Sequence, residues 1–300
     1  MRRAMNSMVS RTMAVVLVTL ILGVLPVLAQ AGNAKTNTTS KIVYHNGPVK
    51  GGTTRVYLIW YGNWTGVSPG SNSETQDLVE LFVSGLGSTP YFLINTGYPD
   101  SSGNAPNGHL VYAGSVNDLY SRGDELNQLS IQDIISDKIL LSSELPLDTS
   151  GTYIVLASSD VSANALGFCT PNTPPHHGRV VVEGAQLTYA FIGNPMRCPS
   201  SAAPQLSPGQ PTPTGNFAAD GIANSLAAVL SAIVTNPIGT GWYDRYGLEN
   251  STKCRGVFGE TYVTANGARA NMRLLGYDWL IQHNWLNGKK SYCSISVPVQ

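Results

Sequence analysis

Apolar and polar positions follow strand and helix periods along the first half of the chain. β-branched and aromatic residues predict strands over 55–61 and 152–157, and the second run is apolar throughout, as in strands buried on both faces. Apolar residues three and four apart predict helices over 73–86 and 126–141. Shorter apolar runs predict further strands at 41–44, 91–95, 110–112, 180–182 and 187–192, the last two joined as a hairpin at Glu183-Gly184. This order predicts an α/β fold, a layered mixed sheet with flanking helices.

The most apolar segment of the second half runs from Leu226 to Val234. Asp220 and Asn224 before it favour a helix start, and Pro237 after it cannot continue a helix. Because the run has no polar face, it predicts a core helix buried on all sides. The segment 200–217 is rich in Pro, Ser, Gly and Thr and predicts a surface loop or an interdomain linker, of which the flanking cysteines favour the loop. We therefore expect a loop-rich C-terminal half.

The N-terminus has the pattern of an export signal. Arg2, Arg3 and Arg11 form a basic region, an apolar run covers 13–28, and Ala29-Gln-Ala31 is a small-x-small cleavage site. An uncleaved membrane anchor is the alternative, since the run approaches spanning length, but the cleavage site favours removal. We expect a signal peptide at 1–31, a disordered leader at 32–40 and one domain at 41–300.

Charge and cysteine content narrow the possible partners. Charged residues are 12% of the chain and the net charge is zero, which gives no electrostatic basis for binding nucleic acid or, after signal cleavage, a membrane. Four cysteines in an exported chain favour two disulfides, and three pairings are possible. Order along the chain suggests Cys169 with Cys198 and Cys254 with Cys293. No close Cys-x-x-Cys pair suggests zinc, and no cofactor is expected.

Two groups of polar residues in the middle of the chain are candidates for chemistry. His176 and His177 follow a proline-containing stretch and could bind zinc or copper, although neighbours in sequence rarely point at one ion. In the other interpretation one histidine is exposed and the other bonds a loop carbonyl. Asp160 follows a predicted buried strand, where open α/β sheets place ligands, but it could equally cap the next turn. We expect no metal site; these histidines would be its ligands if one existed.

The segment 241–249 places aromatic rings beside carboxylates. Trp242, Asp244 and Glu249 are of the residue types that bind carbohydrate, with rings stacking on sugars and acids accepting from hydroxyls. The alternative is a packed loop in which Asp244 bonds Arg245 or the backbone. A second aromatic segment, 277–285, alternates like a strand.

Taken together, these segments resemble the EXORDIUM or phosphate-induced protein family of secreted proteins. The matching residues run in one order over nearly the whole mature chain: Val56–Asn63, Ala157–Val161, Gly167–Cys169, His177-Gly178, Tyr189–Asn194, Cys198, Asp220-Gly221, Val234–Pro237, Gly241, Cys254, Gly256, Phe258-Gly259, Tyr262 and Asn271. The resemblance implies an extracellular or cell-wall protein, linked in plants to growth and brassinosteroid response, with no established catalytic activity.

A fainter resemblance is to secreted bacterial zincin-like proteins. Their pattern His-Glu-x-x-Glu-Ala-Val-Thr-Asp-Pro is followed by Gly-Trp-Tyr-Asp, and this chain matches at 234–237 and 241–244. Ala228, Val229 and Ala232 stand where the ligands and the catalytic acid would be, so the resemblance implies a degenerate zincin-like fold without its metal. His177, Asp220 and Glu249 would be remnants of the old site or parts of a new one.

We therefore expect a secreted, non-catalytic protein that binds an extracellular protein partner or cell-wall carbohydrate. Its site would be a cleft between the histidines, Asp160 and the segment 242–249. The alternative is a hydrolase acting on peptide or glycan, and glycan cleavage requires two converging carboxylates. The candidates are Asp160, Asp220, Asp244 and Glu249. A structural wall protein is a third possibility, which the varied, non-repetitive sequence does not favour.

Overall fold

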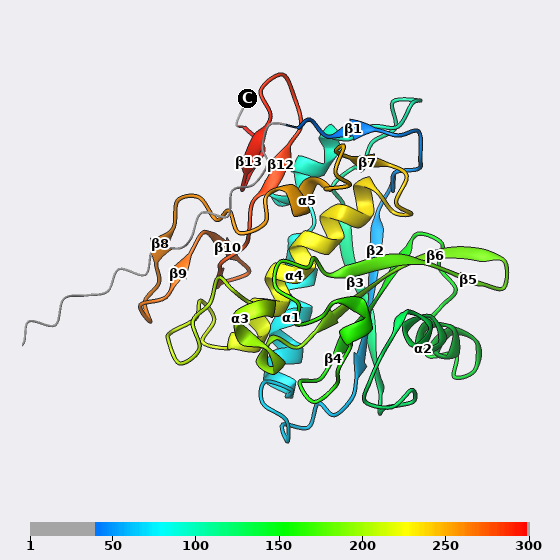
Figure 1. The fold of residues 1–300 in the computed structure, drawn as a ribbon, viewed down its shortest axis with the longest axis vertical. Helices are drawn as coiled ribbons and strands as arrows, with labels where there is room; N and C mark the ends of the chain where they lie inside the picture. The colour runs from blue at the N-terminus through cyan, green and yellow to red at the C-terminus, as the bar shows by residue number, and fades with distance from the viewer. Residues whose placement is uncertain (1–39, 299–300) are drawn as a thin grey trace, which may run out of the picture. The chain divides into compact units, whose positions relative to one another are not determined.

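A five-stranded mixed sheet is the centre of the fold in the computed structural model, which describes residues 40–298 (Figure 1). The predicted signal peptide and nearly all of the leader lie outside these residues. The strand order is β3 (Leu110–Asp118), β2 (Thr54–Tyr61), β4 (Gly151–Ala157), β6 (Ala185–Gly193) and β5 (His176–Val182). The first four strands are parallel, and β5 is an antiparallel edge strand paired only with β6. The predicted α/β class and the β5–β6 hairpin are confirmed.

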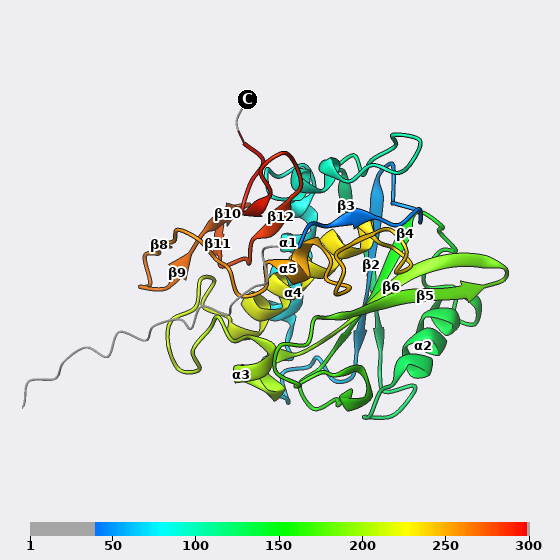
Figure 2. The same ribbon diagram turned by 45° about the horizontal axis from the view of Figure 1, so that its top comes forward.

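Alternate residues of each central strand face opposite layers of helices. On β2, Val56, Leu58 and Trp60 pack with α1 (Ser73–Leu86) and α4 (Phe217–Thr235). The residues between them face α2 (Gln128–Leu140), which packs Ile131, Ile134 and Ile135 on the other side of the sheet. Figures 1 and 2 show α2 on the opposite side of the sheet from α1 and α4.

Helix α4 is the buried core helix that the sequence predicts, but it begins earlier. Asn216 caps it by accepting a hydrogen bond from the Ala219 N–H at 3.0 Å, so Asp220 lies inside the first turn. The predicted start was wrong because Phe217 to Ala219 continue the buried face back into the predicted loop. The helix is long and apolar enough to cross a membrane, yet 89% of its apolar window is buried within the fold, as in the core helix of a globular domain.

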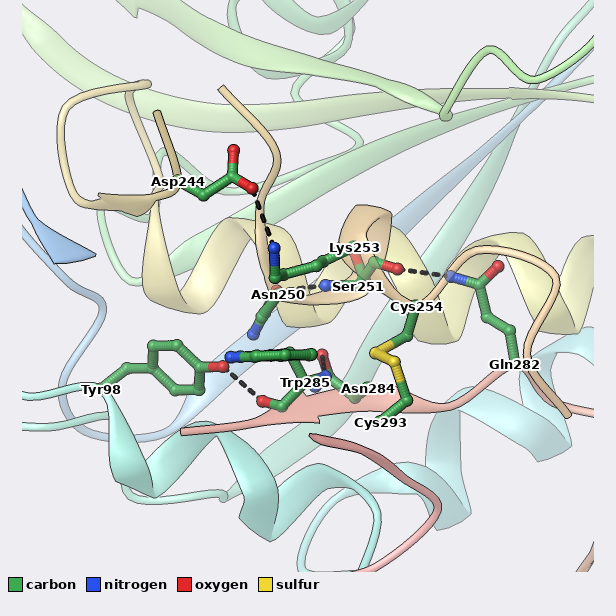
Figure 3. The surroundings of a disulfide bond; sticks show 10 residues. All are labelled: Tyr98, Asp244, Asn250, Ser251, Lys253, Cys254, Gln282, Asn284, Trp285 and Cys293. Carbon is green, nitrogen blue, oxygen red and sulfur yellow. Dashed lines mark hydrogen bonds and ion pairs between the residues drawn. A yellow bond between two sulfur atoms is a disulfide. The ribbon is translucent and has the colours of Figure 1, made fainter. Parts of the chain in front are cut away.

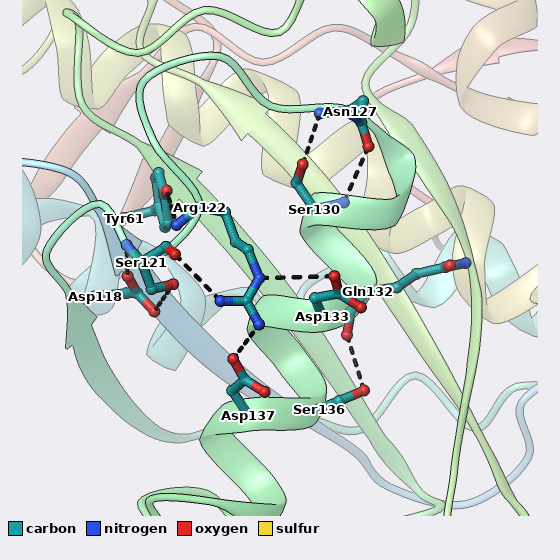
Figure 4. Close-up of polar contacts among 10 residues, drawn as sticks. All are labelled: Tyr61, Asp118, Ser121, Arg122, Asn127, Ser130, Gln132, Asp133, Ser136 and Asp137. Carbon is teal, nitrogen blue, oxygen red and sulfur yellow. Dashed lines mark hydrogen bonds and ion pairs between the residues drawn. The ribbon is translucent and has the colours of Figure 1, made fainter.

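Helix α2 begins with a reciprocal cap, and one arginine lies beside both of its aspartates. The Asn127 side chain accepts from the Ser130 N–H, and the Ser130 hydroxyl accepts from the Asn127 N–H (Figure 4). The guanidinium of Arg122 bonds the carboxylate of Asp137 and lies 3.6 Å from that of Asp133. The two aspartates of α2 therefore share one guanidinium.

The C-terminal half consists of loops, short helices and two-stranded ribbons, as expected. Hairpins β8–β9 (Tyr262–Val263, Arg269–Ala270), β10–β11 (Met272–Leu274, Tyr277–Trp279) and β12–β13 (Asn284–Leu286, Tyr292–Ser294) follow α5 (Asn250–Lys253). The strand predicted over 277–285 is divided between β11 and β12. Strand β1 (Val43–Tyr44) pairs with β7 (Trp242–Tyr243), which joins the first described strand to a distant part of the chain. Residues 199–202 form the short helix α3 within the predicted loop.

The strand predicted at 91–95 is instead a 3₁₀ helix, η1 (Phe92–Gly97). Tyr91 precedes its first residue, and in the turn before it the Thr89 hydroxyl accepts from the Phe92 N–H at 3.1 Å. Apolar residues at 92 and 94 are buried by this turn as well as they would be by a strand, so a short apolar run does not distinguish the two. Two further 3₁₀ turns, η2 (Asn164–Leu166) and η3 (Pro195–Arg197), lie in the loops after β4 and β6.

Both predicted disulfides are present. Cys169 and Cys198 are joined with an S–S distance of 2.00 Å, and Cys254 and Cys293 with 2.03 Å. The first joins the loop before β5 to the turn after β6. The second joins the end of α5 to β13. Each therefore fixes a segment of the C-terminal half that has little regular structure of its own.

Candidate functional site

A cleft of 750 Å³ lies at the free edge of the sheet. Its walls come from the start of α2, from strand β5, and from the chain between the end of α4 and α5. The lining residues are Gln128, Gln132, His176, His177, Gly178, Arg179, Tyr189, Asn236, Ile238, Gly239, Tyr243, Gly247 and Glu249. Most of these groups are polar or aromatic, and the volume falls in the range of small-molecule sites, about 300–1,000 Å³.

His177 and Glu249 form an ion pair in this cleft. The Nε2 atom of His177 lies 3.1 Å from both carboxylate oxygens of Glu249, and both side chains are largely buried. Asn236, which ends α4, donates to the same carboxylate at 2.7 Å and accepts from the Gly241 N–H at 2.6 Å. Burial alone would lower the pKa of His177, but the charge and hydrogen bond of Glu249 outweigh it and raise this pKa above its usual value.

His176 points to the other side of the same strand. The histidines were expected in a loop, but both lie on β5, where successive side chains alternate between faces. The Nε2 atom of His176 is 3.1 Å from the hydroxyl of Tyr189, and burial together with the charge of His177 lowers the pKa of His176. The expectation that one histidine is exposed and the other bonds a loop carbonyl was therefore wrong. Within residues 40–298, no three His, Cys, Asp or Glu side chains are grouped to hold a metal ion.

Tyr243 supplies a fixed aromatic ring to the cleft. Its ring stacks on that of His45 with centroids 3.5 Å apart and planes 3° from parallel. The neighbouring Trp242, which the sequence suggested as a sugar-stacking residue, is not in the lining. Its indole N–H donates to the Pro99 carbonyl at 2.9 Å, and its ring packs edge-on against Tyr98. Tyr243 of β7 therefore lines the cleft, whereas Trp242 packs against a core cluster.

Asp244 is part of a buried structural network (Figure 3) and is not among the residues that line the cleft. Its carboxylate is 2.9 Å from the ammonium group of Lys253, and both side chains have no exposed surface. The ammonium group also bonds the Ser40 hydroxyl at 2.9 Å and lies 4.9 Å from the centre of the Trp285 ring. Burial alone would raise the pKa of Asp244, but the hydrogen bonds from Ser40, Lys253 and the backbone lower it. This network fixes the loop that presents Glu249.

Asp160 and Asp220 also lie outside the cleft lining. Asp160 accepts from the hydroxyls of Tyr120 and Ser158 at the carboxyl end of β4. Asp220 is 2% exposed and accepts from the Thr214 N–H at 3.1 Å and from its hydroxyl at 3.0 Å. Burial raises the pKa of Asp220 to about 7. Of the seven candidate residues, the structure brings His177 and Glu249 into contact, and His176 lines the same cleft from the other face of β5.

Sequence reasoning missed most of the polar lining. Gln128, Gln132 and Arg179 line the cleft without belonging to any motif, and Asn236 and Tyr243 lie in matched segments but were not named as site residues. Asn236 could be noticed as the residue between the core helix and its terminating proline. The two glutamines and the arginine look like ordinary surface positions of a helix and an edge strand, so only the tertiary arrangement identifies them.

The fold and the cleft define an α/β protein with a polar, partly aromatic cleft at the free edge of a mixed sheet. The chain belongs to the phosphate-induced protein 1 family, because the model of that family's conserved region matches residues 42–272. This agrees with the resemblance drawn from the motifs.

Named plant proteins are similar to the chain over most of its length. Protein EXORDIUM-like 3 of Arabidopsis thaliana is 28% identical over 287 residues, covering 85% of this chain and 82% of the relative. Protein EXORDIUM of the same plant is 26% identical, with 75% and 76% covered. Protein PHOSPHATE-INDUCED 1 of Nicotiana tabacum is 26% identical, with 72% of each chain covered. No solved structure matches the chain.

Proposed function

We propose that the protein acts outside the cell as a non-catalytic binding protein of the EXORDIUM type, and that its cleft binds carbohydrate. The observation that carries the proposal is the cleft itself, in which amide and imidazole groups surround one fixed aromatic ring. Sugars present many hydroxyls and apolar ring faces. A site with several hydrogen-bonding side chains and an exposed aromatic face suits them better than it suits an apolar ligand.

Tyr243 is well placed to stack on a sugar ring. His45 covers one face of the tyrosine with ring centroids 3.5 Å apart, and Tyr243 lines the cleft, so a sugar would stack on the face opposite His45. Pairing of β7 with β1 holds the backbone on both sides of this ring. Because the Tyr243 side chain is already held in place, it should lose little conformational entropy when a ligand binds.

The arrangement of carboxylates supports binding rather than glycan hydrolysis. Glycosidases place two carboxyl groups about 5–10 Å apart across the bond that they cleave. Glu249 is the one carboxylate among the lining residues, and it is already bonded to His177 and Asn236. Asp160, Asp220 and Asp244 belong to separate hydrogen-bonded networks.

An extracellular location is part of the proposal. It is supported by the export pattern at 1–31, by two disulfides of the kind that oxidising compartments allow, and by the family. The link to growth implied by the family resemblance would then be exerted from the extracellular space or the cell wall.

Calorimetric titration of the secreted mature protein with cell-wall oligosaccharides tests the proposal. We expect binding to at least one glycan class and a loss of about tenfold or more in Tyr243→Ala, because that variant removes the stacking face. Tyr246→Ala is the matched control, since Tyr246 lies on the same loop, is 54% exposed and does not line the cleft. Absence of binding to any neutral or acidic glycan, or equal losses in both variants, would overturn carbohydrate binding in this cleft.

A further inference from the structure

We propose that the cleft selects acidic glycans, whose uronic acid residues carry carboxylates, and that Arg179 recognises that carboxylate. The inference rests on the proposed function, because it specifies the class of sugar that the same cleft takes. It comes from the balance of charge among the lining residues and from the way Arg179 is held.

The fixed charges of the cleft do not cancel. Glu249 is the single negative lining residue, and its partner is His177. Arg179 lies on the exposed part of β5, and within residues 40–298 no carboxylate oxygen lies within 4 Å of its guanidinium. With the Glu249–His177 pair matched, Arg179 leaves a net positive charge in the cleft.

The nearest acidic helix does not supply the missing partner. Asp133 and Asp137 on α2 are both directed to Arg122, whereas Gln132 points away from that cluster (Figure 4). The amide nitrogen of Gln132 donates to the carbonyl oxygen of Arg179 at 3.1 Å. Helix α2 therefore presents an uncharged amide to the cleft and keeps its carboxylates on another side.

The backbone of Arg179 is held by hydrogen bonds, whereas its guanidinium makes little contact with residues 40–298. Its backbone is paired with Thr188 on β6 and receives the bond from Gln132, which fixes the position of the residue. Among residues 40–298, the guanidinium has one long hydrogen bond, 3.4 Å from Nη1 to the amide oxygen of Gln186. A planar guanidinium can bind a carboxylate through two parallel, charge-assisted hydrogen bonds, which are stronger than the bonds that it can make to the uncharged hydroxyls of a neutral sugar.

A matched pair of ligands tests this selection. Oligogalacturonides and the same oligomers with their carboxyl groups reduced to alcohols have equal length and linkage, and both are titrated into the mature protein with a calcium chelator present. We expect the acidic form to bind about tenfold more tightly at low salt. Added salt should reduce this preference, because screening weakens the pairing of exposed charges.

Variants assign the preference to one residue. Arg179→Gln should bring the two ligands to nearly equal affinity, and Arg179→Lys should restore part of the difference, since it keeps the charge without the planar fork. Arg269→Gln is the control, because Arg269 is exposed on the remote β9 strand. Unfolding curves of all variants should coincide with that of the parent, which shows that each variant is folded.

The outcomes separate the two proposals. Equal binding of the acidic and reduced oligomers would overturn acid selection and leave carbohydrate binding standing, and so would binding of neutral glycans only. A preference for the acidic oligomer that persists in Arg179→Gln would overturn the assignment to Arg179. Binding of no glycan at all would overturn the proposed function together with this inference.

Discussion

Replacing Asp220 with asparagine should change how the stability of the protein depends on pH. The carboxyl group is 2% exposed in the first turn of α4, it accepts hydrogen bonds from Thr214, and within residues 40–298 no basic side chain lies within 4 Å of it. Burial raises its pKa from 3.8 to about 7. Ionisation of this group is therefore less favourable in the folded chain than in the unfolded chain.

The size and sign of the effect follow from that difference. Between pH 3.8 and about 7 the folded protein retains a proton that the unfolded chain has released. The free energy of unfolding consequently falls as pH rises through this window. About three pH units at 1.36 kcal/mol each correspond to a loss of up to about 4 kcal/mol by pH 8. Asp220→Asn keeps the shape and an acceptor oxygen but does not titrate, so it should escape this loss.

Urea unfolding of the parent and the variant at pH 4 and pH 8 measures the effect. The variant should gain up to about 4 kcal/mol relative to the parent between these values. His177, whose raised pKa also makes stability fall as pH rises, is present in both proteins and cancels in the comparison. Asp124→Asn, at an exposed aspartate, should follow the parent. A difference between Asp220→Asn and the parent that does not change with pH would refute the reasoning, since the Thr214 bonds would then hold the ionised carboxylate as well as water does.

Three other substitutions should lower the free energy of urea unfolding at pH 7. Lys253→Met leaves Asp244 buried without its cation and should cost about 3–5 kcal/mol; a loss below about 1 kcal/mol would contradict the role given to the pair. Leu226→Ala opens a cavity beside α4 and should lower the free energy of unfolding by about 2–5 kcal/mol. The control Leu129→Ala, at a residue that is 64% exposed, should change it by no more than about 0.5 kcal/mol. Equal losses in the two variants would argue against the packing described. Gly193→Ala places a methyl group 2.3 Å from an aromatic ring carbon and should cost about 1–3 kcal/mol; an unchanged midpoint would mean that the ring moves freely.

The fold was predictable where one local pattern decided the structure. A run of β-branched and aromatic residues located β2, a short continuous apolar run located β4, and a longer apolar run located α4. The pattern failed at 91–95, where a strand and a 3₁₀ turn bury the same apolar residues. It also gave too short a β3, because this edge strand continues through half-exposed residues to Asp118.

The cleft was only partly predictable, because it is assembled from distant segments. His177 and Glu249 were singled out by residue type, yet their pairing depends on β5 and α5 meeting across 72 positions of sequence. Arg179 and Gln132 gave no local sign of a role. Asp244 gave a misleading one, since a carboxylate among aromatic residues suits a sugar site as well as it suits a buried ion pair.

The pairing of β1 with β7, together with the bonds of Ser40, sets the order in which the domain can be completed. The Ser40 hydroxyl bonds Asp244 across 204 positions and Lys253 across 213. These partners of Ser40 and β1 become available only after residues 242–253 have been synthesised. Until then the growing chain can form the sheet and its first helices, but Ser40 and β1 lack these contacts. Contacts between such distant segments form late and slowly, so completion of the fold requires nearly the whole chain.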